Sequence, residues 1–158
     1  MNREILFRAK AINRDPNREY KTNYKNGDWV YGFVSTIDGG CNGAAEMNNT
    51  VGVRGIDVDR ETIGEYTGLT DKNGTKIFEG DILQGDEYPY CSDGDYNYYA
   101  EVVWFDNGCC GFGLCTHKNP KSAVRGISDG SCEWFEDFDS NNWSVVGNIY
   151  DSPELIEE

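Results

Sequence analysis

The chain has 158 residues, of which 28 are acidic and 14 basic, so its net charge at pH 7 is −14. The negative electrostatic field of this charge repels phosphate backbones and anionic membrane surfaces, so direct binding of nucleic acid is disfavoured and neither nucleic acid nor a membrane is expected as a partner. The N-terminus lacks the apolar core of a signal peptide, and no later run is long enough to span a bilayer. The sequence therefore predicts a cytoplasmic protein, and one domain is the default at this length.

The composition favours strands and turns over long helices. Nineteen Gly accompany ten Tyr, seven Phe and four Trp, and aromatic residues are enriched in strands. Residues 3–9 alternate partly and predict a first strand, and residues 27–35 predict a second strand that is rich in aromatic and β-branched side chains. Residues 37–50 are rich in Gly and Asn and are expected to form a long exposed connection. Residues 51–58 predict a further strand.

Residues 62–83 carry the clearest architectural signal. Two β-like runs flank the turn sequence DKNG at residues 71–74, and an Asn-Gly pair is one of the strongest short hairpin signals. Asn and Gly both tolerate positive φ, so the chain reverses there with little strain. The EGD sequence at residues 79–81 predicts a second turn whose acids accept hydrogen bonds from backbone amides.

The C-terminal half predicts further strands and one short helix. The strands are expected at residues 100–106, 109–114 and 143–149, the first two joined by an Asn-Gly turn. Residues 131–139 fit either a strand or one helical turn. Ser152 and Pro153 have the residue types of an N-cap and a first helical position.

Together these elements predict a mainly β chain that forms a single domain over residues 1–158. A small barrel is expected within residues 61–158, with additional N-terminal strands and loops at residues 1–60 and a short C-terminal helical turn. An unpaired strand edge in such a chain invites symmetric association, so a homo-oligomer is kept as an alternative.

Three stretches resemble the YopX protein family, which is found mainly in phages and prophages. REILFRA at residues 3–9 is similar to the family's REIKFRAW-type start, although Lys10 replaces the usual aromatic residue. Residues 62–83 resemble its "qyTGLkDknGkeIyeGDiv" motif, and VVGNIYDSPELI at residues 145–156 resembles its "viGNiyenPeLl" close. The resemblance spans the chain and implies a largely β architecture with a small SH3-like barrel. It supplies no catalytic or ligand-binding residues.

A stretch that mixes acids with tyrosines, residues 84–99, is the candidate binding surface. Tyrosines give rigid, amphipathic contact area at low entropic cost, and acids among them favour a basic partner and steer its approach. The alternative is that the rings fold back over a thin core. The candidates are Asp86, Tyr88, Tyr90, Asp93, Asp95, Tyr96 and Tyr98.

The cysteines are expected to be free thiols, some of them buried, because no secretory signal accompanies them. Thiolates and imidazole suit zinc, and the nearest approach to a metal cluster is the set Cys109, Cys110, Cys115 and His117. No C-x-x-C pair is present, and adjacent cysteines in a strand point to opposite faces. No metal or cofactor is therefore expected, and a metal site in this segment stays the alternative.

Two functions are compatible with these patterns. No convergent catalytic set is visible, which favours a non-enzymatic, phage-associated accessory protein that binds a protein partner through an acidic, aromatic surface. The alternative is a small metal-dependent enzyme or metal-binding module that uses the Cys/His segment. No catalytic residue is assigned under either hypothesis.

Overall fold

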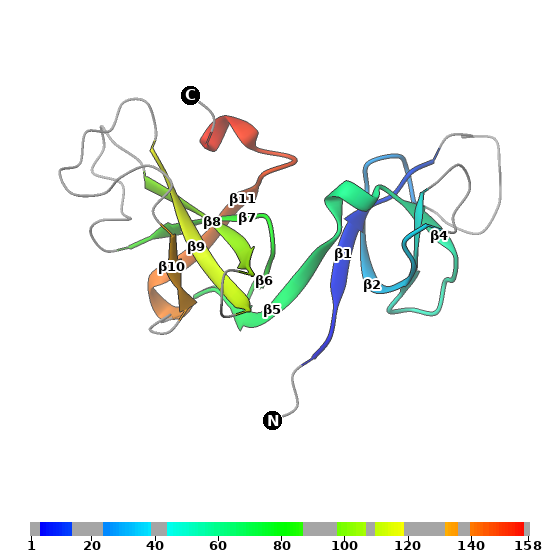
Figure 1. Cartoon of the computed structure of the whole chain (residues 1–158), viewed down its shortest axis with the longest axis horizontal. Helices are drawn as coiled ribbons and strands as arrows, with labels where there is room; N and C mark the ends of the chain where they lie inside the picture. Colours follow the sequence, from blue (N-terminus) through cyan, green and yellow to red (C-terminus); the bar gives the residue numbers. More distant parts are fainter. Residues whose placement is uncertain are drawn as a thin grey trace. The chain divides into compact units, whose positions relative to one another are not determined.

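The computed structural model divides the chain into two compact units, Met1–Tyr66 and Thr67–Glu158 (Figure 1). Both units are built from antiparallel strands. The division falls six residues after the expected internal boundary between residues 60 and 61. The structure describes residues 4–13, 24–38, 44–86, 98–106, 110–118, 132–135 and 140–156.

The first unit is an antiparallel sheet. Its strands are β1 (Phe7–Lys10), β2 (Trp29–Thr36), β3 (Ala45–Asn49), β4 (Ile56–Val58) and the start of β5 (Gly64–Thr70), in the spatial order β4-β3-β2-β1-β5. A short 3₁₀ turn, η2 (Arg60–Thr62), connects β4 to β5. Asp59 caps this turn, because its side chain accepts a hydrogen bond from the Glu61 amide.

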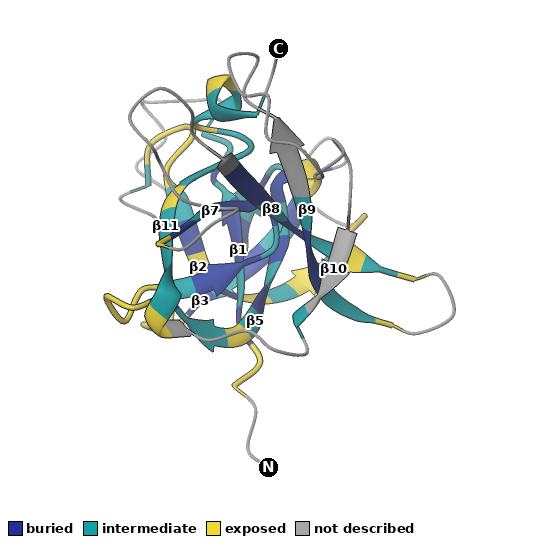
Figure 2. Cartoon of the chain, turned by 90° about the vertical axis from the view of Figure 1, so that its left-hand side faces the viewer, coloured by how far each residue is buried: buried dark blue, intermediate teal, exposed yellow. Residues whose placement is uncertain are grey.

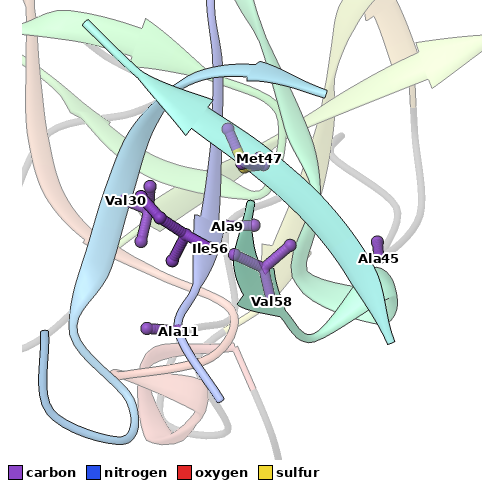
Figure 3. Packing of buried hydrophobic residues seen from close by; sticks show 7 residues of the cluster. All are labelled: Ala9, Ala11, Val30, Ala45, Met47, Ile56 and Val58. Carbon is purple, nitrogen blue, oxygen red and sulfur yellow. The ribbon is translucent and has the colours of Figure 1, made fainter. Parts of the chain in front are cut away.

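Alternation along the strands places one face of this sheet in a core. Seven buried apolar residues form the core, and Figure 3 shows them gathered between the strands: Ala9, Ala11, Val30, Ala45, Met47, Ile56 and Val58. Most come from every second position, as the period of a strand requires. A Cβ at Gly32 of β2 would overlap the backbone of Asn48 on β3.

The first sheet curls but does not close. Val58 of β4 forms a single bridge with Ala11, just after β1. Two backbone hydrogen bonds flank this bridge, from Ile12 N to Asp57 O (2.8 Å) and from Asp59 N to Lys10 O (2.8 Å). Strand β4 therefore returns to the end of β1. Over the described residues neither sheet is closed, so the expected SH3-like barrel is not confirmed and the coarser expectation of a mainly β fold is.

The second unit is built on a five-stranded antiparallel sheet. Its strands are β7 (Asp81–Gly85), β8 (Tyr98–Phe105), β9 (Gly111–Lys118), β10 (Cys132–Trp134) and β11 (Trp143–Asn148), in the order β10-β9-β8-β7-β11. Strand β6 (Lys76–Phe78) pairs with β5. The turn η4 (Ser140–Asn142) precedes β11, and η5 (Pro153–Leu155) follows it. The buried core of this unit comprises Ile77, Leu83, Ala100, Val102 and Leu114.

Several predicted elements are confirmed and one is wrong. The strand at residues 143–149 corresponds to β11, residues 131–139 contain the strand β10, and the C-terminal helical turn is η5, with Pro153 at its first position. Residues 37–50 are not one long exposed connection, because β3 lies within them and is largely buried (Figure 2). Because this segment is rich in Gly and Asn, its alternating pattern was not recognised as a strand. Ala45 and Met47 occupy alternate positions and point into the core.

The predicted hairpin and the predicted second turn are both confirmed. Strands β5 and β6 flank the turn at residues 71–74, and Gly74 has φ of +81°. At the following turn Gly80 has φ of +79°. The carboxylate of Asp81 accepts a hydrogen bond from the Phe78 amide (2.8 Å), which is the contact expected of an acid in that turn.

Asp71 connects the hairpin turn to the last strand. This carboxylate is 4% exposed and accepts hydrogen bonds from the backbone amides of Asn73 (2.8 Å), Thr75 (2.8 Å) and Val145 (3.0 Å). The Lys72 amide donates to the carbonyl of Trp143 (3.0 Å). The turn therefore occupies backbone groups of β11 at residues 143–145.

Acid should weaken this connection. Burial raises the pKa of Asp71, but the hydrogen bonds from Val145, Thr75 and Asn73 outweigh burial and hold the pKa below its ordinary value. The stabilisation is therefore complete above the ordinary Asp pKa of about 4 and is lost as the pH falls through the lower, folded-state pKa. We expect the unfolding free energies of the wild type and Asp71→Asn to converge below about pH 4, as measured by urea titrations. A difference that stays constant across this range would contradict the prediction.

Candidate functional site

The acidic, tyrosine-rich stretch lies between two neighbouring strands of the second unit. Strand β7 ends at Gly85 and β8 begins at Tyr98, and these strands pair antiparallel. Of the seven candidate residues, the structure describes Asp86 and the backbone of Tyr98. The other five lie outside the described residues: Tyr88, Tyr90, Asp93, Asp95 and Tyr96.

Asp86 is tied to the hairpin turn. Lys72 Nζ donates to both carboxylate oxygens of Asp86, at 2.6 and 2.7 Å, and the Asp86 amide donates to the Asn142 carbonyl (2.8 Å). The side chains of Lys72 and Asp86 are 35% and 49% exposed. Because exposed ion pairs contribute at most about 1 kcal/mol, this pair orients the start of the stretch more than it stabilises the fold.

The far end of the stretch begins a long strand pair. Tyr98 is opposite Lys118, and Tyr99 is opposite His117, in the register of β8 and β9. Tyr99 is 8% exposed, and its burial raises the pKa of the phenol. At this end of the stretch Tyr99 therefore packs into the core. This is what the alternative hypothesis expects, in which the tyrosine rings fold back over the core instead of forming a binding surface.

The Cys/His segment falls on β9 and its approach. Cys110 is an exposed free thiol, whereas Cys115 is disulfide-bonded, so the expectation of a free thiol is wrong for Cys115. A disulfide sulfur cannot act as a thiolate ligand. In the register of β9 and β10, Cys132 is opposite Cys115. Cys109 lies outside the described residues.

Neither a metal cluster nor a membrane span is found in the described parts of the chain. Among those residues no group of three or more His, Cys, Asp or Glu side chains could hold a metal ion. Within the same ranges no helix is long and apolar enough to cross a bilayer.

The negative charge is segregated between the two units. Residues 67–158 contain 18 acidic and 5 basic residues, a net charge of −13, whereas residues 1–66 contain 10 acidic and 9 basic residues, a net charge of −1. Almost all of the charge of −14 therefore belongs to the second unit. The sum over the whole chain conceals this difference.

An exposed aromatic row on β2 was not singled out from the sequence. Trp29, Tyr31 and Phe33 alternate with the buried Val30 and Gly32, so the three rings share the face opposite the core. Tyr31 is 42% exposed and Phe33 is 50% exposed. The alternation is visible in the sequence, but it does not tell which of the two faces is buried.

Two cations lie on the same face as this row. Register pairs in an antiparallel sheet share a face, and on β1 Arg8 is opposite Tyr31 while Lys10 is opposite Trp29. The Arg8 guanidinium carbon lies 4.6 Å from the centroid of the Trp29 ring, and Lys10 Nζ lies 5.3 Å from it. Both distances are within cation–π range.

The described residues define a β protein of two antiparallel units, one of which is strongly acidic. The sequence profile of the YopX protein family matches residues 17–157. The chain belongs to this family, as the stretches at residues 62–83 and 145–156 indicated; the similar start at residues 3–9 precedes the matched range.

A solved structure is also similar to this chain. The crystal structure of protein EF1440 from Enterococcus faecalis is 25% identical in sequence, with a TM-score of 0.41, over 75% of this chain and 72% of that chain. No curated protein matches this chain.

Proposed function

We propose that this YopX-family chain is a non-enzymatic, phage-associated accessory protein that binds a basic protein partner through its second unit. The observation that carries the proposal is the charge segregation, with 18 acidic against 5 basic residues after residue 66. Such a field raises the rate of encounter with a cationic partner and rejects anionic ones.

The stretch at residues 84–99 is the proposed contact region. It combines acids with several tyrosines, and tyrosine and arginine are the residue types that recur at protein interfaces. Asp86 fixes one end through its ion pair with Lys72 and its backbone bond to Asn142. Tyr99 fixes the other end through its burial in β8. Both ends of the stretch are therefore held by the sheet of the second unit.

A pull-down from bacterial lysate tests the proposal. The bait is the full chain, and the variant carries Asp93→Asn, Asp95→Asn, Tyr90→Ala and Tyr96→Ala. We expect the wild type to retain one or a few basic proteins at about 0.1 M salt and to lose them near 1 M, where exposed charges are screened. The variant should lose the same proteins at the lower salt.

A charge-matched control separates a defined contact from general acidity. Glu154→Gln with Glu157→Gln removes two acids at the C-terminal end, outside the proposed contact region. This control should retain the wild-type partners. The proposal is wrong if the contact-region variant retains every partner, or if both variants lose them equally.

A further inference from the structure

Strand β10 is the shortest strand of the five-stranded sheet and lies at its edge. It ends the order β10-β9-β8-β7-β11 and lies beside β9 (Figure 1). Its register pairs are Cys132↔Cys115, Glu133↔Leu114 and Trp134↔Gly113. So few pairs bring few backbone hydrogen bonds, and pairing alone therefore holds β10 weakly.

The register brings two cysteines together across β9 and β10. Cys115 of β9 is disulfide-bonded. Of the other cysteines that the structure describes, Cys110 is free and Cys132 is directly opposite Cys115. Opposite residues in an antiparallel pair have Cα atoms about 4.5–5.5 Å apart, which is within the range of about 4.4–6.8 Å that a disulfide spans. A bond between Cys115 and Cys132 therefore needs no movement of the two strands.

We propose that Cys115 and Cys132 form a redox-sensitive crosslink, whose reduction releases β10 from β9 while the rest of the second unit stays folded. Cys115 is half-buried and β10 is at the sheet edge, so a reductant reaches the bond without opening the core. The buried core of the unit comes from β6, β7, β8 and β9. Release of β10 withdraws Phe135 from the margin of this core and leaves its buried residues in place.

The redox step is a thiol–disulfide exchange with a dithiol reductant. One thiolate of the reductant attacks a sulfur of the Cys115–Cys132 bond and forms a mixed disulfide, while the other cysteine leaves as a thiolate and takes up a proton. The second thiol of the reductant, as its thiolate, then attacks the mixed disulfide and releases the remaining cysteine, which is protonated in turn. The chain gains two electrons and two protons and holds two thiols, and the dithiol becomes a disulfide.

The crosslink closes residues 116–131 into a loop and so keeps β10 close to β9. In the chain-entropy account, a disulfide across a loop of about 15 residues favours the joined arrangement by about 100-fold. Reduction removes this advantage and leaves β10 held by its register pairs alone. This proposal is independent of the proposed protein contact at residues 84–99, so either one can fail without the other.

Peptide mapping of the full chain, purified without reductant, tests which cysteines are bonded. Free thiols are first alkylated, and trypsin with chymotrypsin then isolates residues 113–118, which contain Cys115, from residues 126–134, which contain Cys132. We expect mass spectrometry to find these two peptides as one linked species that separates on addition of dithiothreitol. An alkylated Cys115, or Cys115 linked to a different cysteine, would overturn the proposal.

Hydrogen exchange of the full chain before and after addition of dithiothreitol tests the release of β10. We expect the amides of residues 132–134 to exchange at least about 10-fold faster after reduction. The amides of residues 82–84 on β7 should keep their rates. Unchanged exchange in β10 would show that its pairs hold it without the bond, and equal acceleration on β7 would show that reduction unfolds the unit. Either result would overturn the proposal.

Two variants assign the response to this pair of cysteines. Cys115→Ser with Cys132→Ser should show the fast exchange of β10 without reductant and no further change when dithiothreitol is added. The matched control is Cys110→Ser, which removes the exposed free thiol just before β9 and should respond to dithiothreitol as the wild type does. A response that persists in the double variant, or that is lost in Cys110→Ser, would place the redox chemistry at other thiols and overturn the proposal.

Discussion

Gly32→Ala should unfold or severely weaken the first unit. The added Cβ would overlap the carbonyl oxygen of Asn48 and would lie 2.8 Å from both its carbonyl carbon and Asn49 Cα. All three atoms belong to the backbone of β3, so no side chain can move aside. Strands β2 and β3 would have to separate, and we expect a loss of about 3 kcal/mol of unfolding free energy, the upper end of overpacking costs. Urea titration followed by circular dichroism measures the loss.

Gly27→Ala is the matched control for this clash. Gly27 has φ of +88° and no atom within 4 Å of the added Cβ, so alanine adds backbone strain without overlap. The left-handed region costs a non-glycine residue about 1–2 kcal/mol. If Gly27→Ala proved as destabilising as Gly32→Ala, close strand approach would not explain the requirement for glycine at residue 32.

Asp71→Ala should strongly destabilise the second unit. It leaves the amides of Asn73, Thr75 and Val145 without the acceptor that they share. A buried donor that loses its partner costs about 1–3 kcal/mol. Water reaches the exposed Asn73 and Thr75 amides, so we expect a total loss of about 3 kcal/mol, dominated by Val145. Hydrogen exchange at residues 143–145 should accelerate together with this loss.

Lys72→Ala separates the carboxylate network from the ion pair beside it. Lys72 contacts Asp86 with its side chain, but it reaches Trp143 with its backbone amide. The substitution removes only the exposed ion pair and should cost less than about 1 kcal/mol. A loss as large as that of Asp71→Ala would place the stabilisation in the ion pair instead of in the buried carboxylate.

Local turn chemistry explains why the hairpin could be predicted. The Asn-Gly pair specifies a chain reversal by backbone preference alone, and β5 and β6 flank it. Strand β3 could not be found in the same way. Alanine and asparagine have little intrinsic preference for strands, so Ala45 and Met47 depend on burial against β2 and β4.

The candidate surfaces could not be identified from neighbouring residues alone, because they depend on which distant segments pair in the fold. The alternation in β2 placed three rings on one face, but only the pairing with β1, whose Ala9 faces the core, shows that this face is the outer one. The net charge of −14 describes the whole chain, and the net charge of residues 1–26 has the opposite sign. The disulfide state of Cys115 depends on which chain segments meet, and that cannot be deduced from cysteine positions.

The hairpin turn also covers part of the edge of the five-stranded sheet. Strand β11 is at the end of the five-stranded order, and a free strand edge is a template on which other chains add strands and form amyloid-like aggregates. Asp71 and Lys72 already occupy Val145 N and Trp143 O on that edge. The hairpin turn therefore occupies two of the backbone groups through which another chain could add a strand to this edge.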